Sequence, residues 1–143
     1  MMYADLLAKR LDREIQICAE DPKLSAGGIS IWRQDDVVFA SFSSGREGSS
    51  GVFALRCSQF DAEPPSVAMV DQQTLEDLPP ERWTPGVCHG VHPVTGRGFV
   101  CIQGVAEYHT HPSHLEDSWD RYRNRFRIPQ TIRRLLQKAG AIE

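Results

Sequence analysis

The sequence has no hydrophobic run that approaches the roughly 18 residues needed for a membrane-spanning helix. Its first five residues do not contain a basic stretch followed by an apolar one, so we expect no secretory signal and a cytoplasmic location. Without export, the cysteines are predicted to be reduced thiols rather than two disulfides. There are four of them: Cys18, Cys57, Cys88 and Cys101.

The sequence also has no strong excess of positive or negative charge, since its formal net charge is −3. Nucleic acids and acidic membrane surfaces attract proteins with a basic surplus, so we expect neither as a partner. The serine- and glycine-rich segment 43–51 lacks the Gly-Lys-Ser/Thr ending of a phosphate-binding loop. We interpret this segment as a hairpin loop.

The length and composition are those of an ordinary globular protein. A chain of 143 residues, 41% hydrophobic and 24% charged, can bury roughly 70% of its extended surface without disulfides or metals. No internal repeat or low-complexity tract divides it. We therefore predict a single domain over residues 1–143.

The first half of the chain predicts an α+β fold. Helical spacing of apolar residues over 3–20 predicts one amphipathic helix, which Asp21-Pro22 ends. Its inward side chains are expected to be Leu7, Leu11, Ile15 and Cys18. Strands are expected at 29–33, 37–42, 52–58 and 66–70, with Cys57 facing inward. Short turns between them predict a four-stranded antiparallel meander with the helix packed on one face.

The second half is predicted to be irregular at first and then helical. Residues 71–90 contain three prolines and are expected to form a loop, with Trp83 covering the core. Ser113 followed by Glu116 matches a capping box, so a helix carrying Trp119, Tyr122 and Phe126 is expected to begin there. Pro129 is predicted to break it. A last helix is expected over 131–139, with Gly140 ending it.

Residues 91–120 concentrate the reactive side chains. They hold Cys101 and four of the five histidines: His92, His109, His111 and His114. A thiol beside imidazoles indicates either cysteine nucleophile chemistry or metal binding. Cys101 between Val100 and Ile102 could also be a buried strand residue, although Gly98 and Gly104 favour a loop. Cys88 is a rival nucleophile.

The metal interpretation has two forms. His109, His111 and His114 with Cys101 could provide four zinc ligands, because alternating histidines on a strand point the same way. His109-Thr110-His111-Pro112 also resembles part of the motif of JAMM-type metallopeptidases. That motif requires an aspartate three residues after a serine, whereas Ser118 is followed by Asp120 and then Arg121. Hydrogen-bonded loop histidines are the third possibility.

The order of these segments resembles the ubiquitin-conjugating enzyme family. The shared features are the helix, the meander, a double-proline turn at Pro64-Pro65, the His92-Pro93 pair, and Cys101 followed by an aliphatic residue. The resemblance covers residues 5–140. The elements 107–109 and 111–112 are most similar to the bacterial branch, which occurs beside ubiquitin-like modifiers and their activating enzymes.

The resemblance implies a UBC-like fold and a carrier enzyme without a cofactor or metal. Cys101 would accept a ubiquitin-like modifier as a thioester from an adenylating activating enzyme and pass it to an amine of a target protein. His92 would brace the active-site loop rather than take part in the chemistry. A non-catalytic adaptor with the same fold and a buried thiol is the alternative from another class.

Two departures from the family concern the chemistry. Val94 replaces the asparagine that follows His-Pro in eukaryotic members and stabilises the oxyanion, and Trp119 comes much later than the usual tryptophan. We therefore expect His109 or His111 to substitute, as an oxyanion donor or as a base for the incoming amine.

The C-terminal segment is basic. It holds seven of the sixteen lysines and arginines, with no acidic residue among them: Arg121, Arg123, Arg125, Arg127, Arg133, Arg134 and Lys138. A solvated helical face is one interpretation, and a docking surface for an acidic partner is another. Nucleic acid is a third, although no base-reading motif is present.

Overall fold

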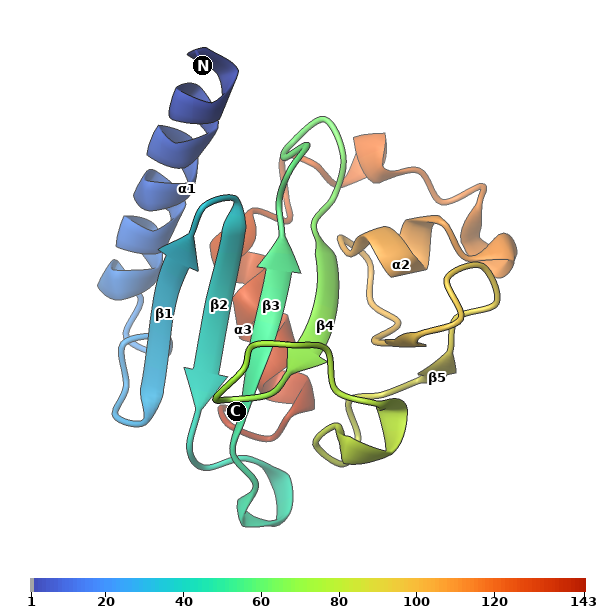
Figure 1. Ribbon diagram of the computed structural model, residues 1–143. Coiled ribbons are helices and arrows are strands. Elements are labelled where there is room, and N and C mark those ends of the chain that lie inside the picture. Colours follow the sequence, from blue (N-terminus) through green and yellow to red (C-terminus); the bar gives the residue numbers. More distant parts are fainter. Residues whose placement is uncertain (1) are drawn as a thin grey trace.

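The structure is a computed structural model that describes residues 2–143; Met1 lies outside them. It has an N-terminal helix, an antiparallel sheet and a C-terminal helix, as the α+β prediction required (Figure 1). The sheet order is β1-β2-β3-β4, with each strand next to its sequence neighbour. The strands are β1 (Ile29–Gln34), β2 (Val37–Phe42), β3 (Gly51–Arg56) and β4 (Ser66–Val70). The helices are α1 (Met2–Glu20), α2 (Ala106–His109) and α3 (Ile128–Lys138).

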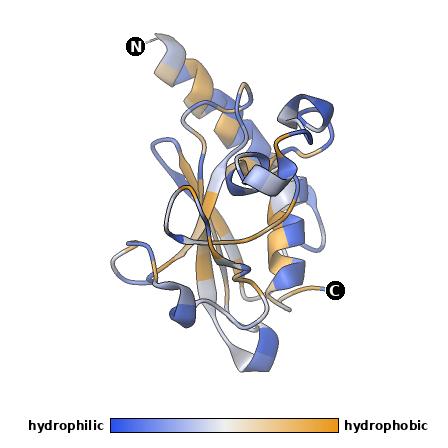
Figure 2. Cartoon of the chain, turned by 90° about the vertical axis from the view of Figure 1, so that its right-hand side faces the viewer, coloured by the Kyte–Doolittle hydropathy of each residue, from blue (hydrophilic) through white to orange (hydrophobic). Residues whose placement is uncertain are grey.

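The core lies between the sheet and helices α1 and α3, and strand alternation selects its members. Phe53 and Leu55 of β3 are fully buried, as are Leu135 and Leu136 of α3. Figure 2 shows this hydrophobic layer between the sheet and the inward side of α3. Cys57 joins the same core at 1% exposure, as predicted. Helix α3 ends at Lys138, and Gly140 follows its cap residue as predicted, with a positive φ of 72° that favours glycine.

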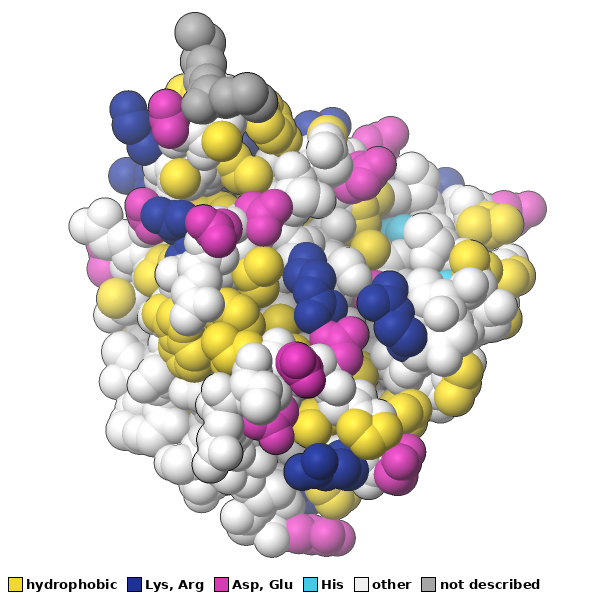
Figure 3. Space-filling model, viewed as in Figure 1, with side chains coloured by type: hydrophobic (Ala, Val, Ile, Leu, Met, Phe, Trp, Pro, Cys, Tyr) yellow, Lys and Arg dark blue, Asp and Glu magenta, His cyan; other side chains and the backbone are white. Residues whose placement is uncertain are grey.

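The opposite face of the sheet carries a second, smaller apolar cluster. Phe39 and Val52 are buried there, and Trp32 stacks on Phe39 with ring centroids 5.4 Å apart. Figure 3 views the molecule from this side and shows a hydrophobic patch over β1 and β2. Both faces of the central strands are therefore apolar.

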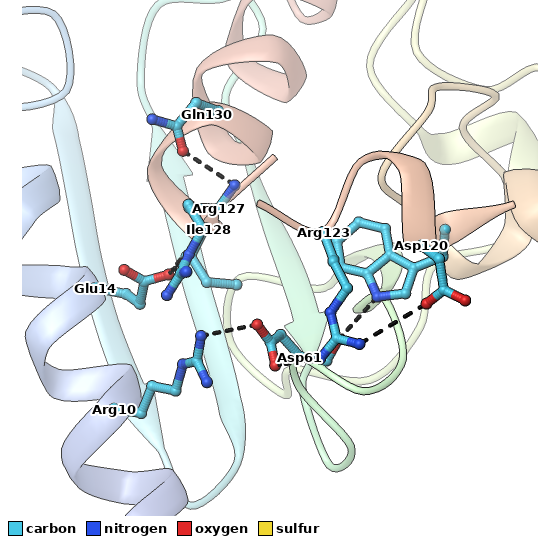
Figure 4. Close-up of polar contacts among 9 residues, drawn as sticks. Arg10, Glu14, Asp61, Asp120, Arg123, Arg127, Ile128 and Gln130 are labelled. Carbon is cyan, nitrogen blue, oxygen red and sulfur yellow. Dashed lines mark hydrogen bonds and ion pairs between the residues drawn. The ribbon is translucent and has the colours of Figure 1, made fainter. Parts of the chain in front are cut away.

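Helix α1 faces the core as predicted, with one exception. Leu7, Leu11 and Cys18 are buried, but the fourth buried position is Glu14 rather than Ile15, which is only partly buried. Glu14 Oε1 accepts from Arg127 Nε at 3.0 Å and from the Ile128 backbone N–H at 3.5 Å (Figure 4). A carboxylate at the first turn of α3 accepts from N–H groups that would otherwise be unpaired. Its negative charge also interacts favourably with the positive end of the helix dipole.

The prediction of a helix from Ser113 through Phe126 is wrong. The segment contains two short 3-10 turns, Pro112–His114 and Trp119–Arg121. Its side chains bond to partners outside the segment instead of supporting a continuous helix: Trp119 Nε1 donates to Asp61 O at 2.9 Å, and Asp117 Oδ2 accepts from Tyr108 Oη at 2.5 Å. The expected break at Pro129 is also wrong, because Pro129 lies in the first turn of α3, where its missing N–H is tolerated.

Two elements near the candidate site were not predicted. Strands β5 (Gly90–Val91) and β6 (Gly98–Phe99) form a small hairpin, and α2 follows it. Figure 1 shows these elements beyond β4, at the free edge of the sheet. Strands of two residues and a helix of four are too short to produce a periodic pattern in the sequence.

The buried ion pair of Glu14 gives a stability prediction. We expect Glu14→Ala to lower the free energy of unfolding by about 1–3 kcal/mol, because it leaves Arg127 and the Ile128 N–H without their partner. Asp12→Ala is the matched control on the same helix. The Asp12 side chain is 59% exposed and pairs with Arg33 at 2.8 Å, so its loss should cost less than about 1 kcal/mol. Urea unfolding measures both, and equal losses would contradict the buried role.

Candidate functional site

The hairpin β5–β6 is fixed by the fully buried imidazole of His92. Its Nδ1 accepts from the backbone N–H groups of Val94, at 3.1 Å, and Thr95, at 3.3 Å. The proton is therefore on Nε2, which donates to Glu107 O at 2.8 Å. Both nitrogens are occupied, and Phe99 packs edge-on at 4.9 Å between ring centroids. This placement fits the bracing role that the family resemblance implies for His92.

Glu107 attaches α2 to the sheet. Its Oε1 accepts from the Val67 backbone N–H at 2.9 Å, and its Oε2 accepts from Ser66 Oγ at 2.5 Å. The neighbouring Ala106 N–H donates to Pro65 O at 2.9 Å. Glu107 is thus the link between the edge strand β4 and the hairpin. Sequence reasoning gave it no catalytic or structural role, since the local pattern does not signal a buried carboxylate.

Cys101 follows the hairpin directly and is partly exposed. Its Sγ lies 3.7 Å from Nε2 of His114, within the range of a sulfur hydrogen bond. Burial raises the pKa of the Cys101 thiol, and the charge of Lys138 opposes this increase. The thiol is therefore protonated at neutral pH and can donate to His114 Nε2. His114, which the sequence suggested only as a metal ligand, is the imidazole beside the thiol.

Asp117 is the centre of the polar network around this pair. Its Oδ2 accepts from Tyr108 Oη at 2.5 Å and from Gln103 Nε2 at 3.0 Å, and its Oδ1 accepts from Tyr122 Oη at 2.6 Å. The bond from Tyr108, followed by that from Tyr122, lowers the pKa of Asp117 to about 2. The ring of Tyr108 also stacks on His114, with centroids 4.1 Å apart and planes 13° from parallel.

His109 and His111 lie in the same region, but each is engaged elsewhere. His109 Nε2 accepts from the Gly104 N–H at 3.0 Å, so its Nδ1 carries the proton and donates to Asp117 O at 2.7 Å. Burial lowers the pKa of His109. His111 Nδ1 accepts from Ser113, and its ring stacks on Phe99. His109 has no free nitrogen for a substrate in this arrangement.

The other three cysteines differ from Cys101. Cys18 and Cys57 are each 1% exposed, and burial raises the pKa of both thiols to about 12. Cys88 is partly buried and donates from Sγ to Gly90 O at 3.5 Å. Only Cys101 has an imidazole nitrogen within hydrogen-bond distance in the described part of the chain.

The metal interpretation finds no support in the geometry. Residues 2–143 contain no group of three or more His, Cys, Asp or Glu side chains placed to hold a metal ion. Both nitrogens of His109 are used by the backbone, and Ser118 Oγ accepts from the Asp120 N–H at 3.3 Å. The residues that suggested a metallopeptidase therefore stabilise loops.

Much of the basic C-terminal segment is paired with acidic residues from elsewhere in the chain. Arg123 bonds Asp61, which also pairs with Arg10 at 2.9 Å (Figure 4), and Arg133 bonds Asp21. Arg134 donates to Gln103 O and lies over the Phe126 ring, 4.2 Å from its centroid. Arg121, with a side chain 68% exposed, is among the few that remain open to solvent. Internal pairing therefore accounts for a large part of the pattern.

Comparison with known proteins does not identify a relative: no family model and no curated protein matches the sequence. In the part of the chain that the structure describes, none of the helices combines the length and the apolar character needed to cross a membrane. The geometry of the site and the order of the elements therefore carry the functional argument.

The low pKa of Asp117 predicts a specific pH dependence. The folded-state pKa of about 2 lies below the ordinary value of 3.8, so the carboxylate stabilises the folded state above pH 4 and loses this effect as the pH falls toward 2. We expect Asp117→Asn to be less stable than the wild type at pH 7, with a difference that shrinks below pH 4. Thermal unfolding at several pH values measures it; a difference independent of pH would contradict the assignment.

Proposed function

We propose that the protein is a carrier of the ubiquitin-conjugating type, in which Cys101 accepts a ubiquitin-like modifier as a thioester. The observation that carries the proposal is the partly exposed Cys101 thiol with His114 Nε2 3.7 Å away. The element order supports it: a helix, a four-stranded meander, a hairpin braced by His92, and then the cysteine.

The geometry suggests how the thioester would form. The modifier would arrive from an activating enzyme as an acyl adenylate at its C-terminus. Cys101 Sγ would attack the acyl carbon, the acyl–phosphate bond would break and release the nucleotide, and the thiol proton would pass to His114 Nε2. A neutral acceptor beside a protonated thiol suits this step, because attack and proton transfer occur together.

The thioester would then be passed to an amine of a target protein. The amine nitrogen attacks the acyl carbon, the carbon–sulfur bond breaks, and the proton that leaves the nitrogen passes through His114 to the sulfur. His114, protonated in the first step and deprotonated by solvent in between, is available to take the proton of the attacking amine. Val94 provides no side-chain donor for the oxyanion. Of the two predicted substitutes, His109 has both ring nitrogens bonded to the backbone, and His111 remains a proposal in that role.

A second candidate is an adaptor with the same architecture and no thioester chemistry. One observation favours it: burial raises the pKa of the Cys101 thiol, whereas catalytic thiols are usually activated by a lowered pKa. The adaptor would use the same surfaces to bind a modifier without accepting it covalently.

A thioester assay tests the choice directly. The protein would be incubated with ATP, a ubiquitin-like protein and its activating enzyme from the same gene neighbourhood. We expect a reducing-agent-sensitive adduct that is absent in Cys101→Ser and retained in Cys88→Ser. Cys101→Ser should leave a stable ester or no product, because the hydroxyl is a weaker nucleophile.

The remaining outcomes distinguish the alternatives. An adduct lost only in Cys88→Ser would show that the protein is a carrier whose nucleophile is Cys88 rather than Cys101. Modifier binding without an adduct, in a partner pair shown to be active with another carrier, would favour the adaptor.

A further inference from the structure

The contact between Cys101 and His114 joins two irregular segments. Cys101 lies in the turn between β6 and α2, and His114 lies in a 3-10 turn beyond α2. Neither segment is part of the four-stranded sheet. A 3.7 Å contact between two such segments depends on side chains that hold them together.

Asp117 bonds to both segments. On the Cys101 side, Oδ2 accepts from Gln103 Nε2 at 3.0 Å, and the backbone oxygen accepts from His109, whose other nitrogen accepts from the Gly104 N–H. On the His114 side, the Asp117 N–H donates to His114 O at 2.9 Å. One residue thus fixes the distance between the two segments.

Tyr108 connects Asp117 to the imidazole itself. Its hydroxyl donates to Asp117 Oδ2 at 2.5 Å, while its ring lies flat against His114. A charge-assisted hydrogen bond of this length fixes the phenol strongly, and the stacked phenol limits the rotation of the imidazole. The position of His114 therefore depends on the bond at the far end of Tyr108.

We propose that Asp117 and Tyr108 are positioning residues, which together clasp the two segments and hold the His114 imidazole against the Cys101 thiol. They act through His114. The proposal rests on the proposed function for the use of this pair in conjugation, but the positioning itself is testable without any modifier.

Tyr122 provides a matched control. Tyr108→Phe and Tyr122→Phe each remove one hydroxyl bonded to the same carboxylate, at 2.5 and 2.6 Å. The Tyr122 hydroxyl also accepts from Gln103 Nε2 at 3.0 Å, so this control loosens the network at least as much. The Tyr108 ring stacks on His114, whereas the Tyr122 ring stacks on Phe126. A general loosening of the network would affect both variants equally, and a positioning role would affect only Tyr108→Phe.

The measurement is the rate of Cys101 alkylation by iodoacetamide as a function of pH, with each cysteine resolved by peptide mass spectrometry. Lys138 is the charged group that acts on Cys101 from α3, and it is unchanged in every variant. In the wild type we expect a lower inflection in addition to that of the thiol itself, because the His114 imidazole lies 3.7 Å from the reacting sulfur. His114→Asn should lose the lower inflection, and Tyr108→Phe and Asp117→Asn should lose it too. Tyr122→Phe should keep it.

Three results would overturn the proposal. The first is a profile in Tyr108→Phe that stays like the wild type while His114→Asn changes. The second is an equal change in Tyr108→Phe and Tyr122→Phe. The third is no change in His114→Asn, which would show that the pair is not coupled. Circular dichroism on each variant ensures that a changed profile is not caused by unfolding.

The alkylation profile is independent of the thioester assay. If the wild type forms no thioester but its alkylation profile depends on Tyr108, the proposed function fails and the positioning role of Asp117 and Tyr108 stands. If a thioester forms and the alkylation profile does not depend on Tyr108, the positioning role fails and the proposed function stands.

Discussion

The buried imidazole of His92 is the constraint on which the candidate site depends. It joins the backbone of the hairpin turn, at Val94 and Thr95, to the backbone of α2, at Glu107. Glu107 in turn attaches α2 to the edge strand β4. Losing this imidazole would leave three backbone polar groups without their partner, and one of them, Glu107 O, makes a buried bond. The segment that presents Cys101 therefore takes its position from the sheet through one histidine.

Beyond α2, hydrogen bonds between polar side chains, rather than hydrophobic packing, hold most of the chain in place. The segment 104–127 has few fully buried apolar residues; Val105 and Trp119 are two of them. Asp117, the two tyrosines bonded to it and His109 hold the rest. Such a network specifies one arrangement when every member is satisfied. It also places ionisable groups beside Cys101, which a purely apolar core would not do.

The sequence predicted the parts that follow a repeating pattern and missed the parts held by single contacts. The helix α1 and the four strands have apolar periodicities, so their order was predicted correctly, and the inward side of α1 was correct except at Ile15. Glu14 escaped prediction because its partner Arg127 is distant in sequence. The segment after Ser113 has a capping signal and helical spacing, yet Asp117 and Trp119 bond to distant residues and prevent a helix. The local preference for a helix is overridden here by hydrogen bonds to residues outside the segment.

The candidate site shows the same division. The residues alone left Cys101 open as a buried strand residue. Its choice as the acceptor thiol, which stays a prediction, and the bracing position of His92 both came from the family resemblance. The choice among His109, His111 and His114 could not be made, because alternate spacing predicts a shared direction only on a strand. The first of them lies in the helix α2, and the other two lie beyond it. Their separate orientations follow from hydrogen bonds to Gly104 and Ser113 and from stacking on Tyr108, which no local pattern encodes.

The most direct test of the central claim is competitive labelling of the native protein with a limiting amount of a thiol reagent, followed by mass spectrometry of all four cysteines. The account predicts that Cys101 is labelled first, Cys88 later, and Cys18 and Cys57 only after unfolding, because these last two are buried with pKa values raised to about 12. Cys88 reacting ahead of Cys101, or Cys101 protected as well as Cys18 and Cys57, would contradict it.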